Sequence, residues 1–172
     1  EATVQGKVFH AVTPDAGVAP GTDSAGTTAA VALYNPVGSG KNLVVLKARL
    51  AYVSGTLGAG EMLWVANTNI AAAATTGTAM ATTNGYLGQG RAAVGAALVT
   101  ATLPAAPTLV RVAFVLDASL ASTAGILGQT PEDDVDGAII VSPGTTISLS
   151  ADAAAGATPI VSISITWAEE DR

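Results

Sequence analysis

The sequence predicts an all-β fold and, within that class, a single-domain antiparallel β-sandwich. Three observations lead to this expectation: apolar and polar side chains alternate along many short segments, Gly and Pro separate these segments, and no segment has a convincing helical pattern. About eight such segments in 172 residues suffice for two sheets that bury their apolar faces against each other. Eight strands in two sheets favour a jelly roll, although periodicity leaves Greek-key immunoglobulin-like packing open.

Residues 42–70 form the stretch around which the other strands are expected to be arranged. In its first half Lys47 and Arg49 lie on one face of the predicted strand, and an apolar row lies on the other. Ser54 and three glycines then supply a turn before the alternation resumes at Met62. The stretch therefore predicts a long antiparallel hairpin whose apolar face needs a second sheet to cover it. The apolar row consists of Val44, Leu46, Ala48, Leu50 and Tyr52.

Further alternating segments complete the predicted sandwich. Ser142, Pro143 and Gly144 predict a tight turn that joins the segments on either side of it into a second hairpin. The segment at 71–90 is rich in Ala, Thr and Gly and is expected to be a long ordered loop with at most a helical turn. The predicted strands lie at 27–34, 97–102, 108–116, 137–141, 145–151 and 160–167.

The N-terminal part is expected to lie outside the sandwich. Residues 4–12 alternate weakly, which is consistent with a short edge strand or an extended arm. Residues 13–26 contain the Pro, Gly and Asp residues that are typical of a surface loop. The predicted organisation is therefore an N-terminal arm and loop at 1–26, followed by the β-sandwich (jelly-roll) domain at 27–172.

The composition narrows the classes of protein to which the chain can belong. Hydrophobic residues make up 49%, with a mean hydropathy of +0.49. No apolar run approaches the ~18 residues of a membrane span, so we expect a soluble protein. The net charge of −6 comes from clusters at 132–136 and 169–171, which repel phosphate, so nucleic-acid binding is not expected. The absence of cysteine excludes disulfides and thiolate sites, and no signal-peptide pattern opens the chain.

No motif indicates an enzyme. Gly38 to Lys41 read GSGK, but a phosphate-binding loop needs a Gly at position 35 and a Ser or Thr at position 42, and both positions hold Asn. The segment also leads into a strand, so a turn is expected there. His10 is the only histidine and lies in the weakly structured N-terminal segment, and no Gly-x-Ser-x-Gly elbow is present. We therefore assign no catalytic or cofactor-binding residue.

Two further groups of residues receive a structural interpretation. The acidic cluster at 132–136 is expected to be a solvated turn, with weak Ca²⁺ binding by Asp134 and Asp136 as the competing hypothesis. Trp64 and Trp167 lie on apolar rows of predicted strands and are expected in the core rather than in a sugar platform. No residue is assigned to a metal site.

Several turn and strand patterns carry a resemblance to a known group of proteins. They lie at 33–44, with Asn35-Pro36 and Gly38-Ser39-Gly40, at 52–60 and at 136–144. With these patterns the chain resembles the small single-jelly-roll structural proteins of tailed bacteriophages, in particular capsid decoration (cement) proteins. The resemblance implies a virion protein on the outer surface of the capsid, a homotrimer that binds between subunits of the major capsid protein. Residues 1–26 and 71–90 are then expected at interfaces.

Other functions stay open at this stage. Similar sequences also resemble tail or head-fibre components of phages. A glycan-binding β-sandwich module for host recognition is the competing class, with Asn84, Tyr86 and Gln89 as its candidate residues in the loop at 71–90. An enzyme of the cupin type needs several histidines for its metal, and the single histidine speaks against it.

Overall fold

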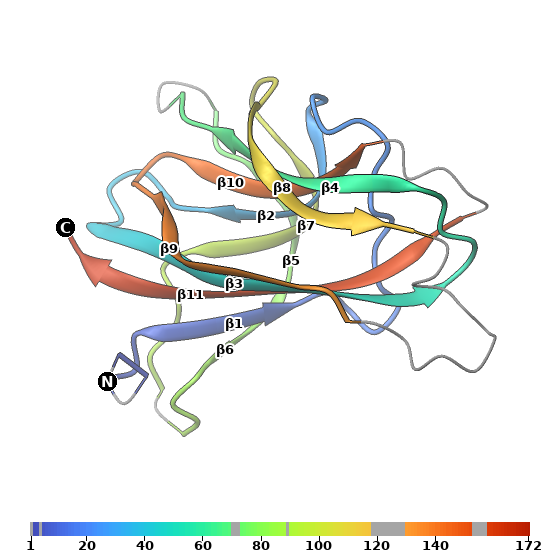
Figure 1. Ribbon diagram of the computed structural model, residues 1–172. Helices are drawn as coiled ribbons and strands as arrows, with labels where there is room; N and C mark the ends of the chain where they lie inside the picture. Colours follow the sequence, from blue (N-terminus) through green and yellow to red (C-terminus); the bar gives the residue numbers. More distant parts are fainter. Residues whose placement is uncertain (1, 4, 70–72, 89, 118–129, 153–157) are drawn as a thin grey trace.

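The computed structural model describes residues 2, 3, 5–69, 73–88, 90–117, 130–152 and 158–172. Over these residues the chain forms eleven strands in two antiparallel sheets that face each other (Figure 1), and no described residue is helical. The predicted all-β sandwich is confirmed.

Every strand pair within the two sheets is antiparallel. The five-stranded sheet has the order β6 (Ala81–Asn84), β1 (Val8–Val12), β11 (Ile160–Asp171), β3 (Lys41–Ser54) and β9 (Glu132–Val141). The six-stranded sheet has the order β5 (Thr76–Ala79), β7 (Ala96–Thr102), β2 (Thr28–Tyr34), β10 (Thr146–Asp152), β4 (Gly60–Asn67) and β8 (Thr108–Leu116).

Both predicted hairpins are wrong. β3 pairs with β11 and β9, whereas β4 pairs with β10 and β8, so residues 55–59 carry the chain from one sheet to the other. In the same way β9 and β10 lie in different sheets, and the turn with Gly144 at a φ of 83° crosses between them. Alternation along a strand shows that one face is buried, but it carries no information about the strand to which the backbone is hydrogen-bonded.

The N-terminal strand is an interior strand of its sheet. β1 pairs with β11 on one side and with β6 on the other, so the predicted edge strand is wrong. The segment that follows is fastened to the same sheet, because Val18 and Val161 exchange backbone hydrogen bonds of 2.8 and 2.9 Å. β1 is therefore part of the sandwich, although the sequence analysis placed residues 1–26 in an arm and loop.

The segment predicted as a long loop at 71–90 contains two strands. β5 is an edge of the six-stranded sheet and β6 is an edge of the five-stranded sheet, and only Met80 separates them. Met80 is buried, and its backbone N–H donates to the carbonyl of Ala97 at 2.9 Å. The chain thus joins the two sheets along one side of the sandwich. Local propensity missed these strands because each has only four residues, with Gly, Asn or Ala beside Thr, and because their pairing is long-range.

A β-bulge in β3 changes which face of the strand is buried. Val45 and Lys47 lie opposite consecutive partners on β11, so Leu46 has no direct partner there. Before the bulge Leu43 and Val45 point into the core, and after it Ala48 and Leu50 do. The predicted apolar row is therefore correct only in its second half, because an inserted residue reverses the alternation.

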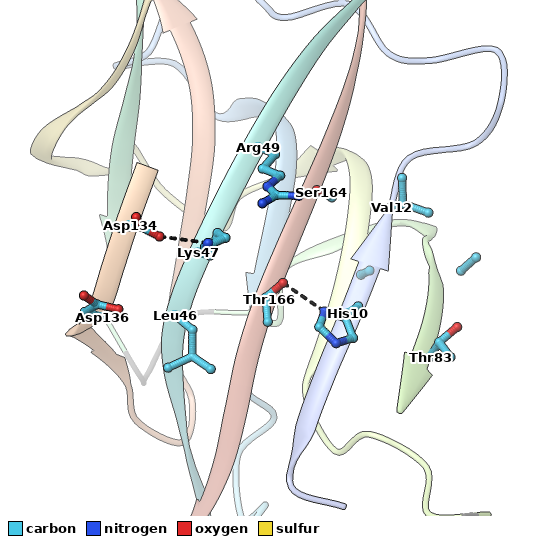
Figure 2. Close-up of a pocket in the computed structure, with 12 residues that line it drawn as sticks. His10, Val12, Leu46, Lys47, Arg49, Thr83, Asp134, Asp136, Ser164 and Thr166 are labelled. Carbon is cyan, nitrogen blue, oxygen red and sulfur yellow. Dashed lines mark hydrogen bonds and ion pairs between the residues drawn. The ribbon is translucent and has the colours of Figure 1, made fainter. Parts of the chain in front are cut away.

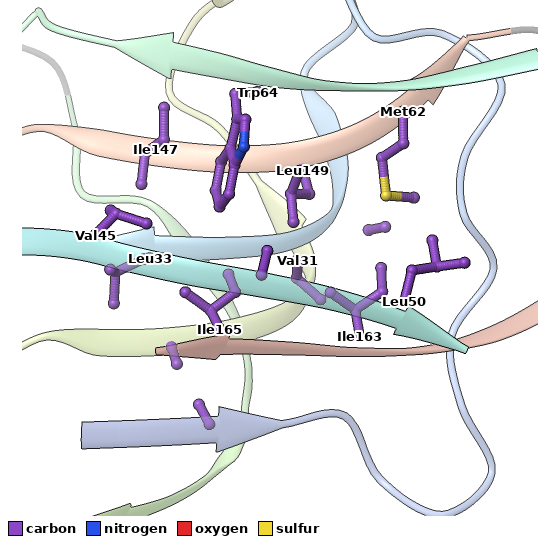
Figure 3. Close-up of a cluster of buried hydrophobic side chains, with 14 of the residues drawn as sticks. Val31, Leu33, Val45, Leu50, Met62, Trp64, Ile147, Leu149, Ile163 and Ile165 are labelled. Carbon is purple, nitrogen blue, oxygen red and sulfur yellow. The ribbon is translucent and has the colours of Figure 1, made fainter. Parts of the chain in front are cut away.

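The core lies between the two sheets and consists mainly of aliphatic side chains, packed around a few aromatic ones (Figure 3). Trp64 and Trp167 are fully buried in it, so their predicted place in the core is confirmed. Phe9 stacks on Trp167 with ring centroids 5.8 Å apart, which holds β1 against β11. The residues that share a face of β11 with Trp167 are also fully buried, and they are Val161, Ile163 and Ile165.

We expect Leu149→Ala to lower the free energy of unfolding by about 2–5 kcal/mol, because Leu149 on β10 is fully buried and its truncation leaves a cavity. Leu87→Ala is the matched control: Leu87 is exposed, and its loss changes stability by about 0.5 kcal/mol or less. Urea unfolding measures both variants. Equal losses for the two variants would contradict this description of the core.

Candidate functional site

The outer face of the five-stranded sheet carries a depression of about 610 Å³ (Figure 2). All five strands of that sheet contribute side chains to it, so residues from both ends of the chain line one site. The labelled lining residues are His10, Val12, Leu46, Lys47, Arg49, Thr83, Asp134, Asp136, Ser164 and Thr166.

Strand register arranges the polar side chains of the depression in rows. In the first row each residue lies directly opposite the next on the neighbouring strand, in the order Thr83, His10, Thr166, Lys47 and Asp134. Side chains opposite each other on one face of antiparallel strands are about 4.5–5.5 Å apart at Cβ. The row therefore presents a hydroxyl, an imidazole, a second hydroxyl, an ammonium and a carboxylate in sequence across the sheet.

A second row runs parallel to the first, two residues away along each strand. It follows the order Ala81, Val12, Ser164, Arg49 and Glu132. One end of this row is apolar and the other is charged. The charged side chains of both rows lie on β3 and β9, so the ionic half of the depression is separate from its hydroxyl-rich half.

Ion pairs hold the charged half in place. The Lys47 Nζ donates to Glu132 Oε1 at 2.6 Å and to Asp134 Oδ1 at 3.0 Å, and Arg49 Nε donates to Glu132 Oε2. The hydrogen bond from Lys47, followed by that from Arg49, holds the pKa of Glu132 below its ordinary value. The same bonds, from Glu132 first and then Asp134, raise the pKa of Lys47 above its ordinary value. Both groups therefore stay charged over the neutral range.

The acidic cluster at 132–136 is a strand, so its predicted form as a solvated turn is wrong. Alternation along β9 sends Asp134 and Asp136 to the outer face and Asp133 inward, where it is buried. Asp133 accepts a hydrogen bond of 2.6 Å from Trp64 Nε1 and is paired with Arg111. Only Asp133 leaves the outer face, yet the described residues contain no group of three His, Cys, Asp or Glu side chains that could hold a metal ion.

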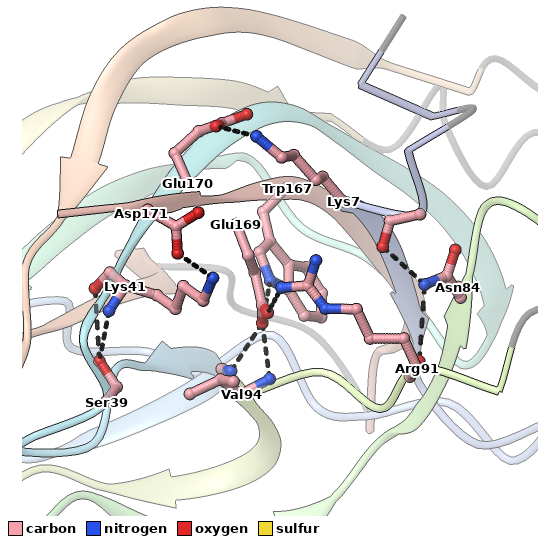
Figure 4. Close-up of polar contacts among 12 residues, drawn as sticks. Lys7, Ser39, Lys41, Asn84, Arg91, Val94, Trp167, Glu169, Glu170 and Asp171 are labelled. Carbon is pink, nitrogen blue, oxygen red and sulfur yellow. Dashed lines mark hydrogen bonds and ion pairs between the residues drawn. The ribbon is translucent and has the colours of Figure 1, made fainter.

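Glu169 is a buried carboxylate that the sequence analysis did not single out (Figure 4). It accepts hydrogen bonds from the backbone N–H groups of Val94 and Gly95 at 2.7 and 2.9 Å and pairs with Arg91 at 3.3 Å. These bonds fasten the segment before β7 to the end of β11. The contacts are long-range, so no local pattern identifies Glu169 as buried.

Of the three predicted loop candidates for glycan binding, one has a structural role in the fold. Asn84 is buried, donates to the carbonyl of Gly6 at 2.8 Å and accepts from the Tyr86 N–H at 2.8 Å, which makes it a structural residue. Tyr86 is exposed, and Gln89 lies outside the described residues. The GSGK segment lies in the turn between β2 and β3. The prediction of a turn that leads into a strand is confirmed.

The edge strand β8 is the second unusual surface of the molecule. In the described part of the chain β8 pairs only with β4, which leaves its other side free of strand partners. Four of its apolar side chains are exposed, at 46–70% of their full accessible surface, whereas Phe114 and Leu116 are buried. Its one charged residue, Arg111, is engaged with Asp133 of β9. The exposed residues are Leu109, Val110, Val112 and Val115.

Comparison with known proteins identified no relative: no protein-family model, no curated sequence and no solved structure matches the chain. In the part of the chain that the structure describes, no helix is long and apolar enough to cross a membrane.

We expect the ion pairs of Glu132 to contribute to the pH dependence of stability. A carboxyl whose pKa is lowered on folding stabilises the protein above its unfolded pKa, and this contribution is lost as the pH falls through the folded pKa. The loss therefore begins below about pH 4.3, the ordinary pKa of Glu. Glu132→Gln should flatten the fall in melting temperature over this acidic range, measured by thermal unfolding at a series of pH values.

Glu61→Gln is the matched control, because Glu61 has no ion-pair partner among the described residues. The melting temperature of the Glu61→Gln variant should fall over the acidic range as steeply as that of the unchanged protein. Parallel pH profiles for the Glu132→Gln variant and the unchanged protein would show that the Glu132 ion pairs make no net contribution.

Proposed function

We propose that the chain is a structural virion protein of a bacteriophage, which decorates and stabilises the capsid by binding between subunits of the major capsid protein as a homotrimer. The proposal rests on the resemblance of the turn and strand patterns, on the strand order and on the apolar edge of β8. The β8 edge is the observation that carries it.

We infer that the sandwich is a jelly roll. Without β5, β6 and β7, the remaining strands lie in the orders β1-β11-β3-β9 and β2-β10-β4-β8. If these eight strands are numbered along the chain, one sheet has the order 1-8-3-6 and the facing sheet has the order 2-7-4-5. These are the strand orders of a jelly roll. Jelly rolls occur in viral capsid proteins and in lectins, so the strand order supports a virion protein without defining its role.

The edge strand β8 supports assembly with other chains. Soluble proteins usually protect a free sheet edge with charges, prolines or a covering segment, since an exposed apolar edge invites association. On β8 the one charged side chain, Arg111, is paired with Asp133, and four apolar side chains face solvent. An assembly in which another protein surface covers β8 removes this liability.

A trimer fits such an edge because a three-fold contact is heterologous: the edge of one copy meets a different surface of the next copy, and the ring closes after three. Three copies also multiply weak individual contacts with a symmetric partner, so each chain needs only a shallow binding surface. The opposite side of the sandwich is closed by β5 and β6, and neither of these two strands contains a large apolar side chain.

We expect the purified protein to be a trimer of 50.4 kDa, three times the chain mass of 16.8 kDa. Val115→Lys should lower the mass towards that of one chain, because it places a charge in the proposed contact. Val37→Lys is the matched control: Val37 and Val115 are both 70% exposed, but Val37 lies in the turn between β2 and β3. Light scattering after size-exclusion chromatography measures all three proteins.

A monomeric unchanged protein, or equal effects of the two substitutions, would overturn the proposed role of β8. Cosedimentation with capsids that lack decoration tests the partner. A stable trimer that does not cosediment would contradict the capsid location and direct attention to a tail or head fibre.

A further inference from the structure

We propose that the depression on the outer face of the five-stranded sheet binds a neutral oligosaccharide. The site lies on a different sheet from β8 and does not depend on the proposed structural role.

Hydrogen-bond donors and acceptors lie side by side in the depression. Lys47 and Arg49 can only donate, whereas Asp134 and Asp136 can only accept. Among the described residues no side chain bonds to the Asp136 carboxylate, so it is free to accept from a ligand. A sugar hydroxyl donates and accepts at the same time, and neighbouring hydroxyls of one ring match fixed donors that lie beside fixed acceptors.

The charge of the site favours a neutral ligand. Lys47 and Arg49 are opposed by three carboxylates, those of Glu132, Asp134 and Asp136, so the ionic half carries a small negative charge. A phosphorylated or sulfated ligand is repelled by the carboxylates, and a polycation meets the two cationic side chains. An uncharged ligand rich in hydroxyls suffers neither repulsion.

The side chains of the site are preorganised for a ligand. The polar groups project from hydrogen-bonded strands in fixed register, and the ion pairs of Lys47 and Arg49 restrict the two longest side chains before any ligand arrives. His10 is oriented in a similar way, because its Nδ1 lies 3.0 Å from the hydroxyl of Thr166. Binding therefore orders few side chains, which lowers its entropic cost.

The depression has a size and a lining that suit a sugar. Its volume of about 610 Å³ is within the range of small-molecule sites, roughly 300–1,000 Å³. Val12 and Leu46 supply apolar surface on opposite sides, against which the C–H faces of a sugar can pack. No Phe, Tyr or Trp side chain lines the depression, so we expect weak binding at a single site, strengthened by avidity on a multivalent surface.

The test is a titration of the ¹⁵N-labelled full chain, followed by amide chemical shifts. The probes are two neutral oligosaccharides, maltohexaose and hexa-N-acetylchitohexaose, with a heparin hexasaccharide as the anionic probe. The proposal predicts saturable shifts with a neutral probe at residues 10–12, 47–49, 81–83, 134–136 and 164–166. It is overturned by no shift with either neutral probe, by shifts elsewhere on the molecule, or by binding of the anionic probe alone.

Asp136→Asn tests the role of the free carboxylate. Asp136 has a φ of 48°, a conformation that Asn also tolerates, so the substitution should leave the fold intact. Loss of a charged hydrogen-bond acceptor should weaken binding roughly tenfold. Asp152→Asn makes the same chemical change at an exposed position on β10, in the other sheet, and should leave binding unchanged. Equal affinities of the two variants would overturn the assignment of Asp136 to the site.

Discussion

Burial of one face of β11 against the opposite sheet is the interaction on which the other features of the molecule depend. The row from Val161 to Trp167 points into the core along most of the strand, and its residues are fully buried. Pairing with β1 and β3 on either side holds β11 in the middle of its sheet. Its opposite face carries Ser164 and Thr166, so the strand that organises the core also lines the centre of the depression on the outer face. Because side chains alternate between the two faces of β11, the same strand packs the core and lines the candidate site.

A sandwich has two open sides, and this molecule closes them differently. On one side the chain itself passes between the sheets at Met80, with β5 and β6 as the two edges. On the other side Asp133 of β9 links the sheets through Trp64 and Arg111. Arg111, the only charged residue of β8, is therefore engaged in an ion pair within the molecule. The edge is therefore left with exposed apolar side chains, which explains why the same strand completes the fold and presents the surface that we propose for assembly.

The sequence analysis was accurate where a feature depends on one segment alone. Alternation located most of the strands, and it placed Trp64 and Trp167 in the core. It failed where the feature depends on a partner. The bulge at Leu46 became visible only from the register with β11 and β9, and the burial of Glu169 depends on backbone N–H groups more than seventy positions away. No apolar pattern marks such positions, because the stabilising contact is made by backbone or by residues remote in the chain.

The sequence by itself determined the class of fold, since the alternation of apolar and polar side chains along each segment is a local property of the chain. Only the tertiary structure decided that β3 and β4, like β9 and β10, belong to opposite sheets. It also brought His10, Lys47, Asp134 and Thr166 into one row. The physical reason is that strand pairing is made by backbone groups that all residues share, so its partners are selected by the packing of the whole sandwich rather than by local sequence.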